Sequence, residues 1–354
     1  MTAIAYQAEI LAVGVVTPVG LDVASAAAAV RAGVSGVREA GVHNKWFEPH
    51  RMALVPEEAL PRLAPALASA PMNSAHARML RLAAPALQQA AELVSKAPVA
   101  LFLGLPEARP GEPDAVGATF LADLAKQAEA NVDLRGSKLH REGGAAGLFA
   151  LCDALAHLQA RRAEYAIVGA ADTFLDLRRL AMLDAEGRIL GERVMDGFVP
   201  GEGAAMLLLA TPACAKRMGA KPLAGVAAAV TGLEPGHRYS AEPYRGDGLA
   251  QTFQTLFAAA GSSPPVRCVY AGFNGESLPA KEWGVAHLRS ASHFASDFRI
   301  EHPADCIGDT GAAAGPIMLG LAAHGIQKGY RRDPCLVWCT SDREPRAAAL
   351  LQAV

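Results

Sequence analysis

The segment HREGGAAGLFALCDALAHLQARRAEYAIVGAAD, residues 140–172, joins a turn of small residues to a helix pattern and then to a strand pattern. Apolar residues recur on one face of the predicted helix: Leu148, Leu151, Cys152, Leu155 and Leu158. The continuous apolar run that ends at Asp172 predicts a strand covered on both faces. Many enzymes present a nucleophile at the start of such a helix, yet this turn holds none.

A second segment, GAAAGPIMLGLAAHGIQKGYRRDPCLVWCTSD at residues 311–342, has the same order of parts. Gly147 and Gly315, near the starts of the two predicted helices, lie 168 positions apart. Gly104 and Gly272, which end two apolar strand patterns, are separated by the same number of positions. Two landmarks at one offset indicate an internal duplication. We therefore predict two similar α/β halves, residues 1–215 and 216–354. Their small-residue turns would either face a shared crevice or serve only tight helix packing.

Composition restricts the class of protein. The 33 Lys and Arg residues nearly balance the 35 Asp and Glu residues, so we expect neither nucleic acid nor an acidic membrane as the main partner. No apolar run approaches the roughly 18 residues of a membrane span, and the N-terminus lacks a basic leader pattern, so we expect a cytoplasmic protein. The six cysteines lack metal-ligand spacing, and no phosphate-loop motif occurs. We therefore expect reduced core cysteines, Cys152 among them, no metal and no cofactor.

Three segments carry a resemblance to a known family. ILAVGVVTPVGLDVASAAAAVRAGVSGVRE, residues 10–39, is similar to the opening of β-ketoacyl synthases. MDGFVPGEGAAMLLLA, residues 195–210, resembles their Asp-Gly-Phe-Val-x-Gly-Glu-Gly-Ala-Gly signature, with Ala205 replacing the last glycine. AEYAIVGAADTFLD, residues 163–176, resembles the strand and acidic turn after their nucleophile helix. The resemblance implies the thiolase-like fold, an α/β fold with two duplicated βαβ-type halves in a five-layer αβαβα sandwich that is usually dimeric.

The same resemblance implies that the catalytic Cys-His-His set of the family is missing. The family's cysteine aligns with Gly144, and its two histidines align with Asn274 and Asp309. The late Gly-Phe-Gly-Gly loop aligns with residues 341–344, which read Ser-Asp-Arg-Glu. An enolate formed beside an ionised Asp309 would meet a negative charge instead of a hydrogen-bond donor. We therefore expect no catalytic residue of the family and no condensation chemistry.

Other residues leave a rebuilt active site open, because a carboxylate and a histidine that converge can perform general acid–base chemistry. The candidates for such a site are His140, Glu142, Glu276 and His302. The more common alternative is that His140 and Glu142 are solvated loop residues and that His302 is a loop or capping histidine. Four residues of the signature are expected to be structural: Asp196, Gly201, Glu202 and Gly203.

The resemblance thus implies a pseudoenzyme, a non-condensing ketosynthase homologue that acts through protein association. It would form a homodimer or a heterodimer, with an acyl carrier protein, an active ketosynthase or a secretion effector as partner. Residues 44–67 and 77–94 resemble the short ketosynthase-like proteins encoded near type VI secretion effectors. The alternative is an enzyme, namely an acyltransferase, hydrolase or decarboxylase of the same superfamily with a rebuilt site.

Overall fold

The computed structural model of the chain describes residues 1–4, 8–108 and 114–354, and most of its strands belong to one large sheet with two matching parts. The strands of the first part are β2 (Ala8–Val16), β5 (Leu101–Gly104), β6 (Lys138–His140), β7 (Tyr165–Thr173) and β8 (Glu202–Ala210). Those of the second part are β9 (Ala224–Leu233), β10 (Val266–Ala271), β11 (Phe294–Glu301), β12 (Cys335–Thr340) and β13 (Pro345–Gln352). The strand order is β6-β5-β7-β8-β2 in the first part and β11-β10-β12-β13-β9 in the second. Both halves therefore have the same topology, which confirms the predicted duplication.

The two parts of the sheet meet where β2 pairs with β9. Residues 8–10 pair antiparallel with residues 224–226, and the short strand β1 (Thr2–Ile4) pairs with the other end of β9. Within each half, β5 runs parallel to β6 and β7, and β10 runs parallel to β11 and β12. β7 and β8 are buried along almost their whole length, as their continuous apolar sequences predict for strands covered on both faces.

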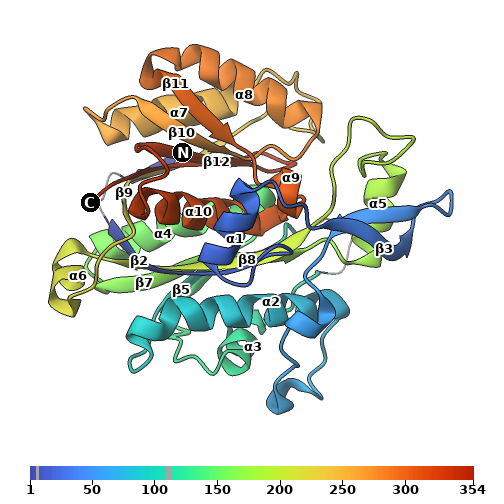
Figure 1. Cartoon of the computed structure of the whole chain (residues 1–354), viewed down its shortest axis with the longest axis horizontal. Coiled ribbons are helices and arrows are strands. Elements are labelled where there is room, and N and C mark those ends of the chain that lie inside the picture. Colours follow the sequence, from blue (N-terminus) through green and yellow to red (C-terminus); the bar gives the residue numbers. More distant parts are fainter. Residues whose placement is uncertain (5–7, 109–113) are drawn as a thin grey trace.

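Helices cover both outer faces of the sheet and also fill the space between its two parts, which gives five layers (Figure 1). The outer helices are α2 (Ser74–Ala91) and α3 (Phe120–Gln127) on the first half, and α7 (Asp247–Ala260) and α8 (Ser277–Arg289) on the second. The central layer contains α4 (Ala146–Gln159) and α10 (Ala314–Gln327), each with 14 residues. The predicted αβαβα sandwich is therefore confirmed.

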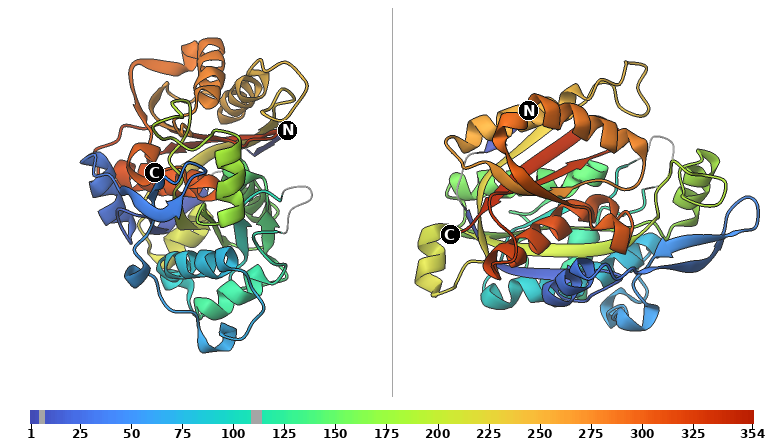
Figure 2. Two further views of the ribbon diagram at one scale, coloured as in Figure 1. Left: turned by 90° about the vertical axis from the view of Figure 1, so that its right-hand side faces the viewer. Right: turned by 45° about the horizontal axis from the view of Figure 1, so that its top comes forward.

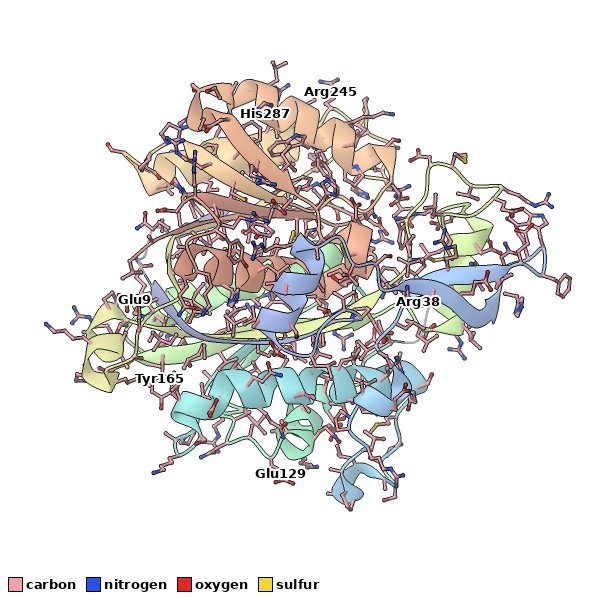
Figure 3. All side chains as sticks on the ribbon, viewed as in Figure 1. Glu9, Arg38, Glu129, Tyr165, Arg245 and His287 are labelled. Atoms are coloured by element: carbon pink, nitrogen blue, oxygen red, sulfur yellow. The ribbon has the colours of Figure 1, made fainter. Side chains whose placement is uncertain are left out.

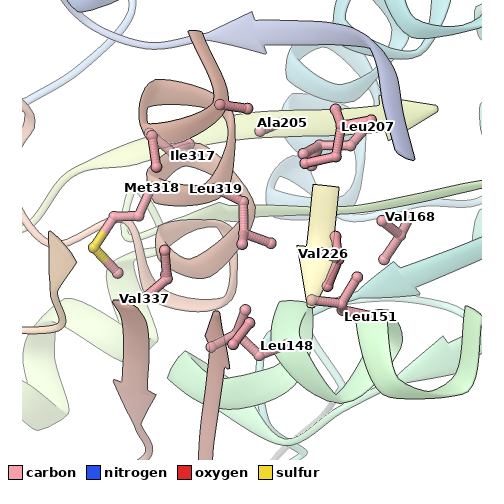
Figure 4. Packing of buried hydrophobic residues seen from close by; sticks show 14 of the residues in the cluster. Leu148, Leu151, Val168, Ala205, Leu207, Val226, Ile317, Met318, Leu319 and Val337 are labelled. Carbon is pink, nitrogen blue, oxygen red and sulfur yellow. The ribbon is translucent and has the colours of Figure 1, made fainter. Parts of the chain in front are cut away.

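The largest part of the core lies around α4 and α10, between the two parts of the sheet (Figure 4). Leu148 and Leu151 of α4 and Leu319 of α10 pack there against strand residues from both halves. Cys152 belongs to this core and is 3% exposed. Burial raises the pKa of its thiol, so Cys152 is a core residue and not a reactive thiolate.

The remaining elements connect or flank the layers. They are α1 (Val23–Arg31), β3 (Val37–His43), β4 (Pro49–Ala53), α5 (Leu177–Ala185), α6 (Pro212–Met218) and α9 (Ala304–Ile307). Short 3₁₀ turns lie at Glu57–Ala59, Pro65–Leu67, Glu92–Val94, Gly143–Ala145, Ala291–His293 and Gly311–Ala313. β3 and β4 form a hairpin that projects from the body of the molecule (Figure 2).

The predicted boundary between residues 215 and 216 falls within α6, which links the two halves. Thr211 caps the start of this helix by accepting a hydrogen bond from the N–H of Cys214, and Pro212 occupies the first turn. Gly219 ends the helix with φ 63°, a left-handed conformation that favours glycine. Local sequence therefore determines where the linking helix starts and stops.

The outer surface carries charges of both signs. Arg38, Glu129 and Arg245 are exposed on different elements (Figure 3). This distribution agrees with a formal net charge of −2. In the described part of the chain, no helix combines the length and the apolar character that a membrane crossing requires.

Candidate functional site

A cavity of about 390 Å³ lies where loops of the two halves meet. The first half contributes Gly144 and Arg188 to its lining, and the second half contributes Asn274, Asp309 and Ser341. The three positions that align with the catalytic set of the family therefore surround one cavity. The duplication explains this arrangement. The turns Gly143–Ala145 before α4 and Gly311–Ala313 before α10 are equivalent in the two halves, and they contact each other.

Gly144 lies in the 3₁₀ turn Gly143–Ala145, directly before α4. A Cβ atom on Gly144 would lie 2.4 Å from the carbonyl oxygen of Thr340, which is backbone and cannot move aside cheaply. Ser341 fills the space next to this turn. Its Oγ accepts a hydrogen bond from the N–H of Ala145 at 3.0 Å and donates one to the carbonyl of Glu142. The turn thus has no room for a cysteine side chain, and one of its amides is already bonded.

Asn274 and Asp309 contact each other on the opposite wall. The Asn274 Nδ2 donates to Asp309 Oδ2 at 2.9 Å and to Glu276 Oε2 at 3.1 Å. The Asn274 Oδ1 accepts from the N–H of Glu276 at 3.0 Å. Asp309 Oδ1 also accepts from the N–H of Gly311 at 2.7 Å. Burial raises the pKa of the Asp309 carboxyl, against the lowering effect of the hydrogen bonds from Asn274 and Gly311.

Arg188 connects this wall to the late loop. Its guanidinium donates to both oxygens of Glu276 at 2.9 and 2.8 Å and to both oxygens of Asp342 at 2.8 Å. Arg238 also contacts Glu276, at 2.8 Å. Burial alone would lower the pKa of Arg188, but its carboxylate partners outweigh this effect and raise the pKa. Glu186 lies 3.7 Å from the same guanidinium, so three carboxylates surround the two arginines in this cluster at the cavity.

Sequence reasoning missed Arg188, because a single arginine in a polar loop carries no motif. Arg346 and Glu282 were missed for the same reason. These two residues are each 1% exposed, and Arg346 Nε donates to Glu282 Oε1 at 2.6 Å. β13 is buried continuously from Arg346 to Leu351, and its sequence pattern provides no signal for the partner of a charged residue inside the strand. The sequence indicates two partners of Arg188 without indicating the arginine: Glu276, a candidate for a rebuilt site, and Asp342, in the altered loop Ser341 to Glu344.

The four signature residues make structural contacts. Glu202 is fully buried and accepts hydrogen bonds from Arg78 at 2.6 Å and from the Thr173 hydroxyl at 2.7 Å. Asp196 accepts from the N–H and the Oγ of Ser277 at 2.6 and 2.7 Å, next to the start of α8. A Cβ on Gly201 would lie 2.4 Å from the carbonyl oxygen of Ile307, and one on Gly203 would lie 3.0 Å from that of Val16.

Of the candidates for a rebuilt site, only His140 and Glu142 lie together, with 3.6 Å between His140 Nδ1 and Glu142 Oε2. Glu276 lines the cavity, whereas His140, Glu142 and His302 do not. His140 lies beside Asp153, with Nε2 3.2 Å from its Oδ2, and His302 is an exposed residue that pairs with Asp305. The cavity therefore holds one candidate carboxylate, Glu276, and none of the candidate histidines, while the His140–Glu142 pair lies outside its lining.

Neither a metal site nor a reactive thiol is found among the described residues. No group of three His, Cys, Asp or Glu side chains there is placed to hold a metal ion. Cys339 lines the cavity, but burial, together with the nearby charge of Asp309, raises the pKa of its thiol. A protonated, buried thiol is a poor nucleophile.

Comparisons with known proteins agree with this fold. Residues 111–214 match the family described as "Beta-ketoacyl synthase, N-terminal domain". A search of curated proteins found no significant match to this sequence.

Several solved structures share the fold at low sequence identity. One is a type II PKS acyl-carrier protein in complex with its ketosynthase bound to the hexaketide, with TM-score 0.78, 18% identity, and coverage of 99% of this chain and 100% of that chain. Another is the ishigamide ketosynthase/chain length factor, with TM-score 0.78, 16% identity and coverage of 99% and 100%. A third is a ketosynthase from module 6 of the bacillaene synthase of Bacillus subtilis 168, with TM-score 0.81, 14% identity and coverage of 98% and 72%. The chain therefore has the thiolase-like fold of these ketosynthases, and residues 111–214 match the ketosynthase family model.

Proposed function

We propose that this protein is a non-condensing ketosynthase homologue that acts by binding another protein. The observation that carries the proposal is the turn before α4. Gly144 has no side chain to attack a thioester, and Thr340 and Ser341 occupy the space that a nucleophile would need. The two aligned histidine positions hold Asn274 and Asp309, which supply neither an imidazole nor a cation to a developing enolate.

Association is supported by large apolar side chains that remain exposed. Phe47, at the tip of the β3–β4 hairpin, is 88% exposed, and Met195 is 84% exposed. Arg193 and Lys45 lie over the ring of Trp46, so the hairpin tip presents aromatic and cationic groups together. Aromatic, methionine and arginine side chains are enriched at protein contact surfaces relative to the rest of the surface.

We propose as partner a ketosynthase, an acyl carrier protein or a second copy of this chain, in the cytoplasm. Among the similar structures, one contains an acyl-carrier protein bound to its ketosynthase and another is a ketosynthase/chain length factor. The likeness of residues 44–67 and 77–94 to short proteins encoded near type VI effectors suggests effector delivery as the setting. Size-exclusion chromatography with light scattering, alone and with the ketosynthase, carrier protein and effector encoded nearby, would identify the complex.

The absence of condensation chemistry is tested by acyl loading. The chain is incubated with malonyl and acyl thioesters, and covalent transfer is followed by intact-protein mass spectrometry. We expect no acyl adduct on the wild type. We also expect none on Gly144→Cys, because the new Cβ would collide with the Thr340 carbonyl.

A different result would support the enzyme alternative. Acyl loading that survives replacement of all six cysteines, or thioester turnover that Asp309→Ala abolishes, would contradict the proposal. The control for the assay is an active ketosynthase with its own cysteine. Gly284→Cys serves as a control for nonspecific loading, because nothing lies within 4 Å of the Cβ position at Gly284.

A further inference from the structure

The arginines inside the cavity have carboxylate partners. The pairs are Arg179 with Asp172, Arg346 with Glu282, and Arg188 and Arg238 with Glu276 and Asp342. Arg178 also lines the cavity, but it is exposed to solvent, where water screens its charge. Asp309 differs from the other interior carboxylates, because no cationic side chain in the described ranges forms an ion pair with it. Asp176 lines the cavity without an ion pair as well, but it caps the start of α5, and Arg179 acts on Asp309 only from beyond ion-pair distance while it pairs with Asp172. Asp309 is therefore a cavity carboxylate without a direct cationic partner or a capping role at an α-helix.

The carboxylate of Asp309 is held in a fixed position. The backbone N–H of Asp309 donates to the carbonyl of Val199 at 2.8 Å, and its own carbonyl accepts from the N–H of Gly201 at 2.8 Å. Its two side-chain oxygens accept from Gly311 and Asn274, and both of these donors are uncharged. A carboxylate oxygen can accept two hydrogen bonds, so each oxygen retains an acceptor site.

The rest of the lining limits the ligand. Asn274 has both hydrogens of its amide committed, to Glu276 and Asp309. Each of these arginines has a carboxylate within ion-pair distance, although the buried Nε of Arg238 makes no hydrogen bond. An anionic ligand beside Asp309 would meet the like charge of its carboxylate. The apolar part of the lining includes Phe273, Ile307, Ile317 and Met318. A ligand that suits both parts has a hydrocarbon chain and a cationic hydrogen-bond donor.

We infer that the cavity binds an alkylammonium group, with the ammonium on the Asp309 carboxylate and the hydrocarbon chain on the apolar lining. The group would belong to a free amine or to a lysine side chain of a bound polypeptide. An ammonium supplies three donors and one positive charge, which matches the free acceptor sites and the missing counter-ion. A neutral hydroxyl would leave the charge of a partly buried carboxylate uncompensated. Burial raises the pKa of the Asp309 carboxyl despite the charge of Arg179, and an ammonium group on the carboxylate would oppose this shift.

Three six-carbon probes test the inference on the full chain: hexylammonium, 1-hexanol and hexanoate. Their dissociation constants at pH 7 are measured by calorimetry or ligand-observed NMR. We expect hexylammonium to bind at least tenfold more tightly than 1-hexanol and hexanoate to bind least tightly. Equal affinities of hexylammonium and 1-hexanol, tighter binding of hexanoate, or no binding of hexylammonium at millimolar concentration would overturn the inference. This comparison needs no variant.

Two matched substitutions locate the charge. Asp309→Asn should weaken hexylammonium binding at least tenfold and leave 1-hexanol binding unchanged. Asp305→Asn makes the same chemical change four residues earlier, on a side chain that is 70% exposed and pairs with His302, and should leave both affinities unchanged. Unaltered hexylammonium binding by Asp309→Asn, or an equal loss in both variants, would contradict the assignment. Thermal unfolding of each variant confirms that it is folded.

The two sources of the group are distinguished with a lysine-containing peptide and its lysine-acetylated form. Binding of the unmodified peptide at least tenfold tighter than hexylammonium, lost on acetylation, would assign the site to a lysine side chain. Tighter binding of hexylammonium than of the peptide would assign it to a small amine. Amine binding does not require protein association. An acyl-loading result that contradicts the proposed function would therefore not contradict amine binding at Asp309.

Discussion

Asp309 changes the chemistry of the cavity, because it stands at a position that aligns with a catalytic histidine of ketosynthases. A histidine can be neutral or cationic near pH 7, whereas the aspartate at this position adds a negative charge to a partly buried cavity. Its uncharged donors, Asn274 and Gly311, stabilise that charge less than a cation would. The position therefore favours ligands with positive charge over the carboxylated and enolate species of condensation.

The pH dependence of stability provides a test at this residue. Burial raises the folded-state pKa of Asp309 above its value in the unfolded chain. Its contribution to stability is therefore fully present below the unfolded pKa of about 3.9 and is lost as the pH rises through the folded pKa. The difference in the free energy of unfolding, Asp309→Asn minus wild type, should increase between pH 4 and pH 7. Urea denaturation at several pH values measures it, and Asp305→Asn is the control.

A flat or falling difference between pH 4 and pH 7 would contradict this sign. The other charged and titratable groups near Asp309 are Glu276, Arg179 and Cys339. They are present in both proteins, so their own titration largely cancels in the difference.

The sequence identifies residues at motif positions of the cavity. It does not identify the side chains that form ion pairs or hydrogen bonds with them. Gly144, Asn274 and Asp309 were found because glycines and alanines around them still match the family pattern. Arg188 lies outside any such pattern and contacts Glu276 and Asp342 only because the chain folds back across 88 and 154 positions. Ion pairs over such separations depend on the fold, which local sequence does not encode.

At the scale of elements, the central helices explain why small residues recur at one offset. Gly147 lets α4 approach α10, because a Cβ there would lie 2.2 Å from Cδ of Pro316 and 3.0 Å from the carbonyl oxygen of Ala312. Gly315 lies close to Leu148 from the other side, with a Cβ distance of 3.0 Å to Cγ. The repeated glycines therefore allow α4 and α10 to pack tightly. The turns before these helices also line a shared cavity, so both alternatives from the sequence apply.

Gly147→Ala tests this packing. In an unconstrained helix the change from glycine to alanine stabilises by roughly 0.5–1 kcal/mol. At Gly147 the collision with Pro316 should outweigh that gain, and we expect a net loss of about 1–3 kcal/mol, typical of overpacking. The matched control is Gly284→Ala in α8, where nothing lies within 4 Å of the new Cβ. We expect the control to stabilise, and urea denaturation compares both with the wild type. Stabilisation by Gly147→Ala would show that α4 and α10 are not closely packed there.

At the scale of the whole molecule, the fold could be predicted because it is duplicated. Two landmarks separated by 168 positions were enough to infer two similar halves, and the strand order repeats accordingly. The β3–β4 hairpin and the cluster around Arg188 have no counterpart in the repeat, and the sequence did not predict them. Duplication preserves the scaffold, whereas loops and cavity charges diverge between the halves.

Arg188 joins the halves, since it follows α5 in the first half and bonds Glu276 and Asp342 of the second. Arg188→Met would remove the cation shared by Glu276, Asp342 and Glu186, and would leave Arg238 as an ion-pair partner of Glu276 and Asp342. Removing one partner of a buried ion pair typically costs about 3–5 kcal/mol, so we expect a loss of that order in the free energy of unfolding. Because the halves share one sheet and one core, the variant should still unfold in one urea transition.

The control for this experiment is Arg193→Met, whose arginine side chain is 59% exposed and pairs with Glu48. An exposed pair contributes about 0–1 kcal/mol, so this variant should remain close to the wild type. Circular dichroism and tryptophan fluorescence are recorded for each urea series. A loss in Arg188→Met no larger than in Arg193→Met would show that Arg188 does not hold the halves together. Separate transitions by the two probes would show that the halves fold independently, because a shared core requires them to lose structure together.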